Sequence, residues 1–77
     1  MRRNLMVDFM VGNMAARWCH GDQRERDAVK NEISLAPLAA RHGLMYQVEN
    51  KLMALGSPAG RAAFHQHVVL PLSREES

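Results

Sequence analysis

Histidine and cysteine are the side chains of this sequence that could hold a metal ion, and their spacing argues against it. His65 and His67 are two residues apart, which places them about 200° apart around a helix, so they could share a metal ion only on a strand. Cys19 and His20 are adjacent and diverge on either kind of element. No second pair has the spacing of a structural zinc site. We therefore expect neither a metal ion nor a cofactor.

Catalysis finds no better support in the sequence. Each serine has a local explanation, because Ser34 and Ser57 suit helix caps and Ser73 lies in a polar tail. The five glycines are dispersed and form no phosphate-binding loop. Cys19 has His20 as its neighbour, but adjacent residues rarely reach the geometry of a nucleophile and its base. We expect a protein that is not an enzyme and takes no small-molecule substrate.

Size and charge narrow the class of protein further. A chain of 77 residues is one small domain, and a domain of this size buries only about 60% of its unfolded surface. Ten Lys and Arg against eight Asp and Glu give a net charge of +2, and the charges are mixed rather than gathered, as in residues 22–27. The single cysteine allows no internal disulfide, which favours a cytoplasmic setting.

The stretch from Leu5 to Cys19 is the most apolar part of the chain. Its methionines recur at every fourth residue, and a second set of apolar side chains at spacings of three and four covers a neighbouring face of the same helix. The stretch has about fifteen residues, whereas a transmembrane helix needs roughly twenty. Asp8 lies within it. A signal peptide and a membrane span are therefore both disfavoured.

A helix that is apolar on two sides cannot be covered by the core of so small a domain. We expect one side to pack inside and the other to contact a second chain, most simply another copy in a homodimer. Methionine suits such a contact because its unbranched side chain adapts to varied surfaces. The alternative is that these methionines form the ordinary core. The predicted interface residues are Met6, Phe9, Met10, Met14 and Trp18.

Helix start and stop signals predict an all-α fold, a compact bundle of four to five short helices. Gly21 suits a left-handed cap after the first helix, and Asp22 with Glu25 suits the start of the second. Ser34 is the next cap, Gly43 is expected to end the third helix and Gly56 the fourth, and Ser57 followed by Pro58 suits the start of the last. The expected helices cover about residues 5–20, 23–33, 35–42, 44–55 and 58–70, with a stop at Pro71 and a polar tail over 72–77.

Residues 35–44 resemble the first helix and turn of a helix-turn-helix motif. Ala39 would allow close helix approach, Gly43 would make the turn and Leu44 would fill the core. Glu49 departs from the pattern, since an apolar residue is expected there, and a plain helical hairpin is the alternative. The groups that could contact nucleic acid or an acidic partner are Arg41, Gln47, Asn50, Lys51 and Arg61.

Two hypotheses follow about function. The first is a small cytoplasmic protein that acts by binding another macromolecule, such as a phage or mobile-element protein that inhibits or adapts a larger protein machine. The second is a DNA-binding transcriptional regulator that uses residues 35–55. We favour a protein partner over DNA, because the chain lacks a concentrated basic run. Neither hypothesis involves a membrane.

Overall fold

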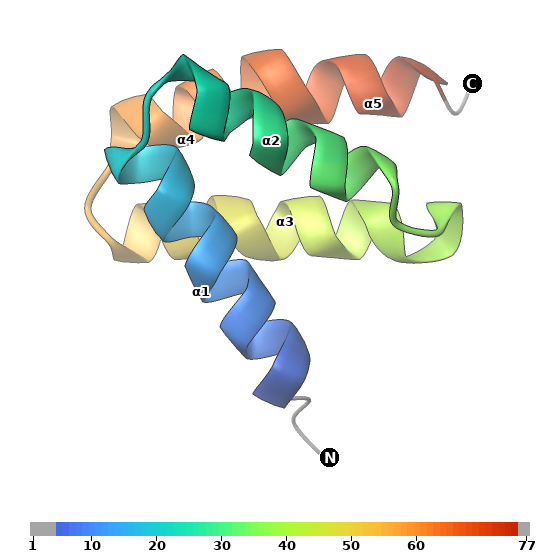
Figure 1. The fold of residues 1–77 in the computed structure, drawn as a ribbon, viewed down its shortest axis with the longest axis horizontal. Helices are drawn as coiled ribbons and strands as arrows, with labels where there is room; N and C mark the ends of the chain where they lie inside the picture. The colour runs from blue at the N-terminus through green and yellow to red at the C-terminus, as the bar shows by residue number, and fades with distance from the viewer. Residues whose placement is uncertain (1–4, 76–77) are drawn as a thin grey trace.

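The computed structural model describes residues 5–75, and it is all-helical over that range, as predicted (Figure 1). Residues 1–4 and 76–77, which include the end of the predicted polar tail, lie outside the described residues. Between residues 5 and 75, no helix combines the length and the apolar character that crossing a membrane requires. The elements are α1 (Leu5–His20), α2 (Gln23–Ser34), α3 (Leu38–Ala54), α4 (Pro58–Phe64), the π-helix η1 (His65–Val69) and α5 (Leu70–Glu75).

Three of the predicted boundary signals are confirmed. The Asp22 carboxylate caps α2 by accepting a hydrogen bond from the Glu25 N–H at 3.0 Å. Gly56 follows α3 with a φ of 76°, a left-handed conformation that glycine adopts without steric cost. The Ser57 hydroxyl then caps α4 by accepting from the Gly60 N–H, with proline at the first helical position.

Gly21 ends α1 for a different reason from the one predicted. Among the described residues only Gly56 has a positive φ, so the left-handed cap expected at Gly21 is wrong. A Cβ on Gly21 would lie 2.3 Å from the Arg17 carbonyl oxygen and 2.5 Å from Glu25 Cβ. Glycine is therefore required here because a Cβ would collide with the last turn of α1 and with Glu25 of α2.

The central helix α3 runs without a break through Gly43, so the predicted separate helices over 35–42 and 44–55 are wrong. Ser34 ends α2 instead of capping a helix, and Pro37 takes the position before α3. A glycine inside a helix costs about 1 kcal/mol relative to alanine. Burial of Met45, Val48 and other side chains along one stripe of α3 outweighs that cost, because each contributes about 1.5–3 kcal/mol.

The helical course also continues through Pro71, where a stop was predicted. The Leu70 N–H donates to the His65 carbonyl, five residues back, which gives the wide turn of a π-helix just before the proline. A wide turn accommodates proline, which lacks an N–H and crowds the carbonyl four residues back in an ordinary α-helix. Leu72 is fully buried, so the predicted tail is instead packed helix as far as Glu75.

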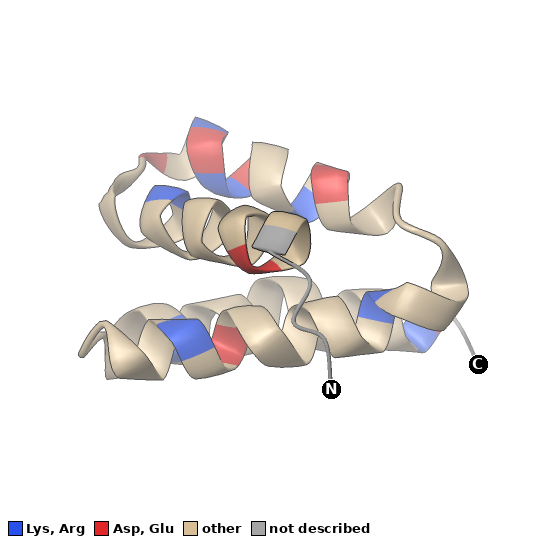
Figure 2. Ribbon diagram, turned by 90° about the horizontal axis from the view of Figure 1, so that it is seen from below, with Lys and Arg blue, Asp and Glu red and all other residues tan. Residues whose placement is uncertain are grey.

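The helices form two layers, with α1 and α2 on one side and α3 with the α4–α5 course on the other (Figures 1 and 2). Trp18 lies between the layers, where its ring meets Phe64 edge-on at a centroid distance of 5.1 Å. Its indole Nε1 donates to the Gly60 carbonyl. The core is one cluster to which every helix contributes: Val11, Met14, Ala15, Trp18, Val29, Ile33, Leu44, Met45, Val48, Leu52, Phe64, Val68 and Leu72.

Candidate interaction surface

The N-terminal half of α1 extends past α3 and away from the other helices (Figure 1). Met6 and Phe9 on this half are 72% and 74% exposed, and Met10 is exposed to a lesser degree. We call these three side chains the α1 overhang. The side of α1 that faces the core is buried, and it includes Met14 and Trp18 nearer the C-terminal end of the helix. Two of the five residues predicted for an interface with another chain thus belong to the protein's own core, and the other three lie at the surface.

An apolar cleft of about 440 Å³ opens between the N-terminal half of α1 and the first turns of α3. Val7 and Met10 form its α1 wall. The α3 wall consists mainly of residues with a small side chain or none, and Gln47 at one end is the only lining residue with a polar side chain. We call this the α1–α3 cleft, and its remaining lining residues are Ala36, Pro37, Ala39, Ala40, Gly43 and Leu44.

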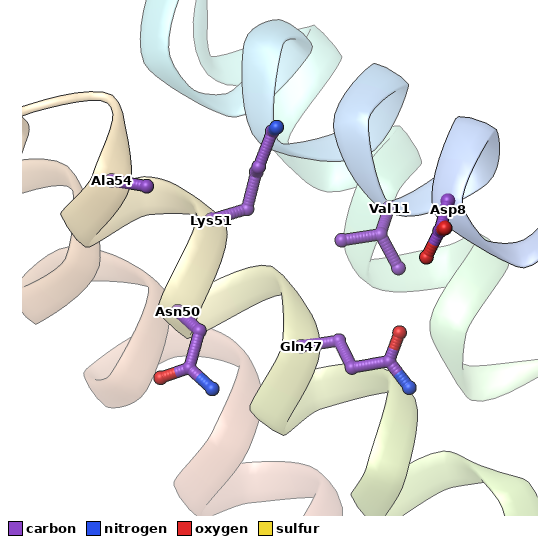
Figure 3. Close-up of a pocket in the computed structure, with 6 residues that line it drawn as sticks. All are labelled: Asp8, Val11, Gln47, Asn50, Lys51 and Ala54. Atoms are coloured by element: carbon purple, nitrogen blue, oxygen red, sulfur yellow. The ribbon is translucent and has the colours of Figure 1, made fainter. Parts of the chain in front are cut away.

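A smaller, polar pocket of about 290 Å³ also lies between α1 and α3 (Figure 3). It brings together three of the predicted contact residues, since Gln47, Asn50 and Lys51 all line it from α3. Figure 3 shows the Lys51 side chain extending toward α1, whereas Asn50 turns the other way. Asp8 lines the pocket from α1. The pocket therefore holds both signs of charge, which does not make it a basic surface.

Arg41 and Arg61 are placed away from that pocket. Arg41 is only 8% exposed, and its guanidinium donates to the carbonyl oxygens of Ser34 at 2.6 Å and Ala36 at 3.3 Å. It therefore satisfies carbonyls at the end of α2, where a positive charge is favourable. The helix-turn-helix geometry predicted for residues 35–55 is wrong, because α3 continues through Gly43. The five predicted contact groups do not form one face.

Glu49 forms a contact that local sequence patterns do not predict. Its Oε1 lies 2.8 Å from His65 Nδ1 in a hydrogen bond, and its other oxygen lies 3.8 Å from a guanidinium nitrogen of Arg61. The Glu49 side chain is only 15% exposed, which explains a carboxylate where an apolar residue was expected. Glu49 and His65 are 16 positions apart in the sequence, so no local pattern predicts their contact. No group of three potential metal ligands occurs between residues 5 and 75.

Charged residues follow one another closely along α2, whose sequence from Arg24 to Glu32 contains both basic and acidic positions (Figure 2). Arg17 on α1 reaches Glu25 at 2.9 Å and Glu32 at 2.7 Å on α2. The hydrogen bond from Arg17 holds the pKa of Glu32 below its usual value, and the two carboxylates raise the pKa of Arg17. This network ties α2 to α1.

The chain matches no protein-family model. It also matches no curated protein and no solved structure. Other large apolar side chains, such as Leu35 and Tyr46, are also exposed. The α1 overhang places three of them on one helix half beside the apolar α1–α3 cleft, and it is the basis for the function proposed next.

Proposed function

We propose that this protein is not an enzyme, that two copies pair through the α1 overhang as a homodimer, and that the dimer acts by binding another macromolecule. The observation that carries the proposal is the exposure of Met6 and Phe9 on a helix whose opposite side is buried. Large apolar side chains gain about 1.5–3 kcal/mol each when they leave water. Clustered exposed apolar side chains therefore mark interaction sites.

Self-association is the simplest use of this surface. A twofold pair places the same patch of each copy in the interface, so the apolar half of α1 in each chain covers the apolar half of α1 in the other. A chain of 77 residues also gains stability from shared burial, because a domain of this size covers a smaller fraction of its surface than a large one. Two of the three overhang side chains are methionines, which adapt to a partner without a fixed shape.

A protein partner is favoured over nucleic acid. The basic groups are dispersed, since Arg41 lies inside and Arg61 lies beside Glu49, and Lys51 shares its pocket with Asp8. Nucleic-acid binders usually gather their basic residues on one face. A small binding protein whose charges are mixed is suited to a protein partner. We therefore propose an inhibitor or adaptor of a larger protein machine, of the type that phages and mobile elements encode.

The mass of the protein in solution tests the proposal. At tens of micromolar, light scattering should give twice the 8.7 kDa chain mass. Phe9→Asp should reduce the mass to one chain without loss of helix signal, because a side chain so exposed contributes little to the fold. Met53→Asp, at another exposed apolar position, is the matched control and should leave the dimer intact. A single-chain mass for the unaltered protein would contradict the proposal.

DNA binding is the competing outcome. Gln47, Asn50 and Lys51 share one surface of α3 and have the side-chain types that contact bases and phosphates. We expect no binding to random duplex DNA at low salt. Binding that weakens steeply as salt rises, and that is lost in Lys51→Gln, would instead favour a nucleic-acid partner.

A further inference from the structure

We infer that hydrogen peroxide oxidises Met6 and Met10 in the α1 overhang, and that this oxidation separates the two copies of the dimer. The inference rests on the homodimer proposed above and adds a reversible regulation of its interface. Five of the six methionines of the chain lie within the described residues, and their exposure differs widely. Oxidation turns the apolar methionine side chain into a polar sulfoxide, so the positions that react decide the outcome.

The methionines of α1 become less exposed from one turn of the helix to the next. Met6 is 72% exposed, Met10 is 41% exposed, and Met14 is buried. Met10 also lines the α1–α3 cleft, which a small solute can enter. Met45 in the centre of α3 is as well buried as Met14. Because peroxide must touch a sulfur atom to oxidise it, the overhang methionines react and the core methionines are spared.

The reaction is the transfer of one oxygen atom. A lone pair of the thioether sulfur attacks an oxygen of hydrogen peroxide, the O–O bond breaks, and a sulfoxide and one molecule of water result. The sulfur loses two electrons and the peroxide gains them. Methionine sulfoxide reductases restore the thioether with a dithiol as reductant, which becomes a disulfide while the oxygen leaves as water. The modification is therefore reversible.

A sulfoxide oxygen in this interface has no side-chain donor to bind. In the single chain, water donates hydrogen bonds to it. In a twofold pair the partner presents the same overhang, Met6, Phe9 and Met10, and none of these side chains carries an N–H or O–H group. Burying a polar group without a hydrogen bond is unfavourable, so oxidation should weaken the dimer by about tenfold or more.

The fold of the single chain does not depend on the oxidised side chains. Val11, Met14 and Ala15 hold α1 in the core, and all three are buried. Oxidation of Met6 and Met10 therefore changes the assembly of the protein and leaves its helices in place. Pairing also covers the overhang, so peroxide reaches these two methionines mainly in the separated chains. Dilute protein should accordingly be oxidised faster at these positions than concentrated protein.

Peptide mass spectrometry after timed exposure to hydrogen peroxide provides the first test. A Cys19→Ser background removes the only thiol of the chain. Met6 and Met10 should be oxidised several times faster below the dissociation constant of the dimer than above it. Met53, which is 53% exposed on α3, should react equally fast at both concentrations. Oxidation of Met10 no faster than that of buried Met14, in dilute protein, would overturn the inference.

Light scattering before and after peroxide provides the second test, in the same Cys19→Ser background. Peroxide should reduce the mass to one chain without loss of helix signal, and a methionine sulfoxide reductase should restore the dimer. Met6→Leu combined with Met10→Leu keeps apolar side chains of similar volume that cannot form sulfoxides, so this dimer should persist in peroxide. Met53→Leu is the matched control and should remain sensitive.

Two results would overturn the redox switch and leave the homodimer standing. One is a dimer that persists although Met6 and Met10 are fully oxidised. The other is a double leucine variant whose dimer is still separated by peroxide. A single-chain mass before any peroxide is added would instead show that the homodimer itself had failed, and the switch with it.

Discussion

The indole N–H of Trp18 donates to the carbonyl oxygen of Gly60 at 2.9 Å, and this buried hydrogen bond joins α1 to α4 across 42 residues of sequence. Glycine at position 60 also leaves room for the cap of α4, because a Cβ there would lie 2.5 Å from the Ser57 hydroxyl oxygen. The guanidinium of Arg26 lies 4.9 Å from the centre of the Trp18 ring. Trp18 thereby fixes the end of α1 against both α2 and α4, while the other end of α1 extends past α3.

Replacing Trp18 should show how much this junction contributes. Trp18→Phe keeps an aromatic ring but leaves the Gly60 carbonyl without its donor and opens a small cavity. We expect the free energy of unfolding to fall by about 2–3 kcal/mol. Urea denaturation followed by circular dichroism measures it. Tyr46→Phe, at an exposed position, is the control and should change it by less than about 0.5 kcal/mol. If Trp18→Phe lowers the free energy of unfolding by less than about 1 kcal/mol, the hydrogen bond between Trp18 and Gly60 is dispensable for stability.

Arg41 should prove to be a structural residue. Arg41→Met keeps an unbranched side chain that replaces much of the aliphatic part of arginine. It removes the donors to the Ser34 and Ala36 carbonyls at the end of α2. The expected cost is about 2 kcal/mol, since hydrogen bonds from charged groups are stronger than neutral ones. Arg24→Met on the exposed part of α2 should be nearly neutral in the same denaturation experiment. Equal effects of the two substitutions would argue against a capping role for Arg41.

Two glycines should respond to alanine with opposite signs. Gly21→Ala should destabilise the protein by about 1–3 kcal/mol or more, because its Cβ would collide with backbone and force α1 and α2 apart. Gly43→Ala should stabilise it by about 0.5–1 kcal/mol, because α3 gains helix propensity and nothing is displaced. Both are best measured in the Phe9→Asp background, where self-association does not contribute. Effects of the same sign would contradict the geometry described for one of the two positions.

Acid should weaken the contact between Arg17 and Glu32. The pKa of Glu32 is lower in the folded than in the unfolded protein, so its contribution is complete above the unfolded pKa of about 4.3 and is lost as pH falls through the folded pKa. The pair is partly exposed, so the contribution should be at most about 1 kcal/mol.

Glu32→Gln measures this contribution when its stability is compared with that of the unaltered protein across the acid range. The difference should be present at pH 7 and vanish in strong acid. Glu75→Gln, at an exposed position in the last helix, should show no such pH-dependent difference. If the difference in the free energy of unfolding between Glu32→Gln and the unaltered protein stays constant with pH, the charge of Glu32 does not contribute to stability.

Much of the helical framework could be predicted from local sequence because its signals act within one turn. The Asp22 cap, the Gly56 stop and the Ser57 cap each depend on residues at most three positions away. The two-sided character of α1 was also visible, because helical periodicity places Phe9 opposite the buried side chains. For that reason the overhang residues Met6, Phe9 and Met10 were among those predicted for an interface.

Sequence by itself therefore determined the helical class, most of the helix starts and the apolar excess of α1, since these follow from spacing along one chain segment. Only the tertiary structure decided that α3 continues through Gly43 and that the last helix continues through Pro71, because long-range burial outweighs a local breaker of a few kcal/mol. It also decided the contact of Glu49 with His65 and the position of the cleft, which depend on helices distant in sequence.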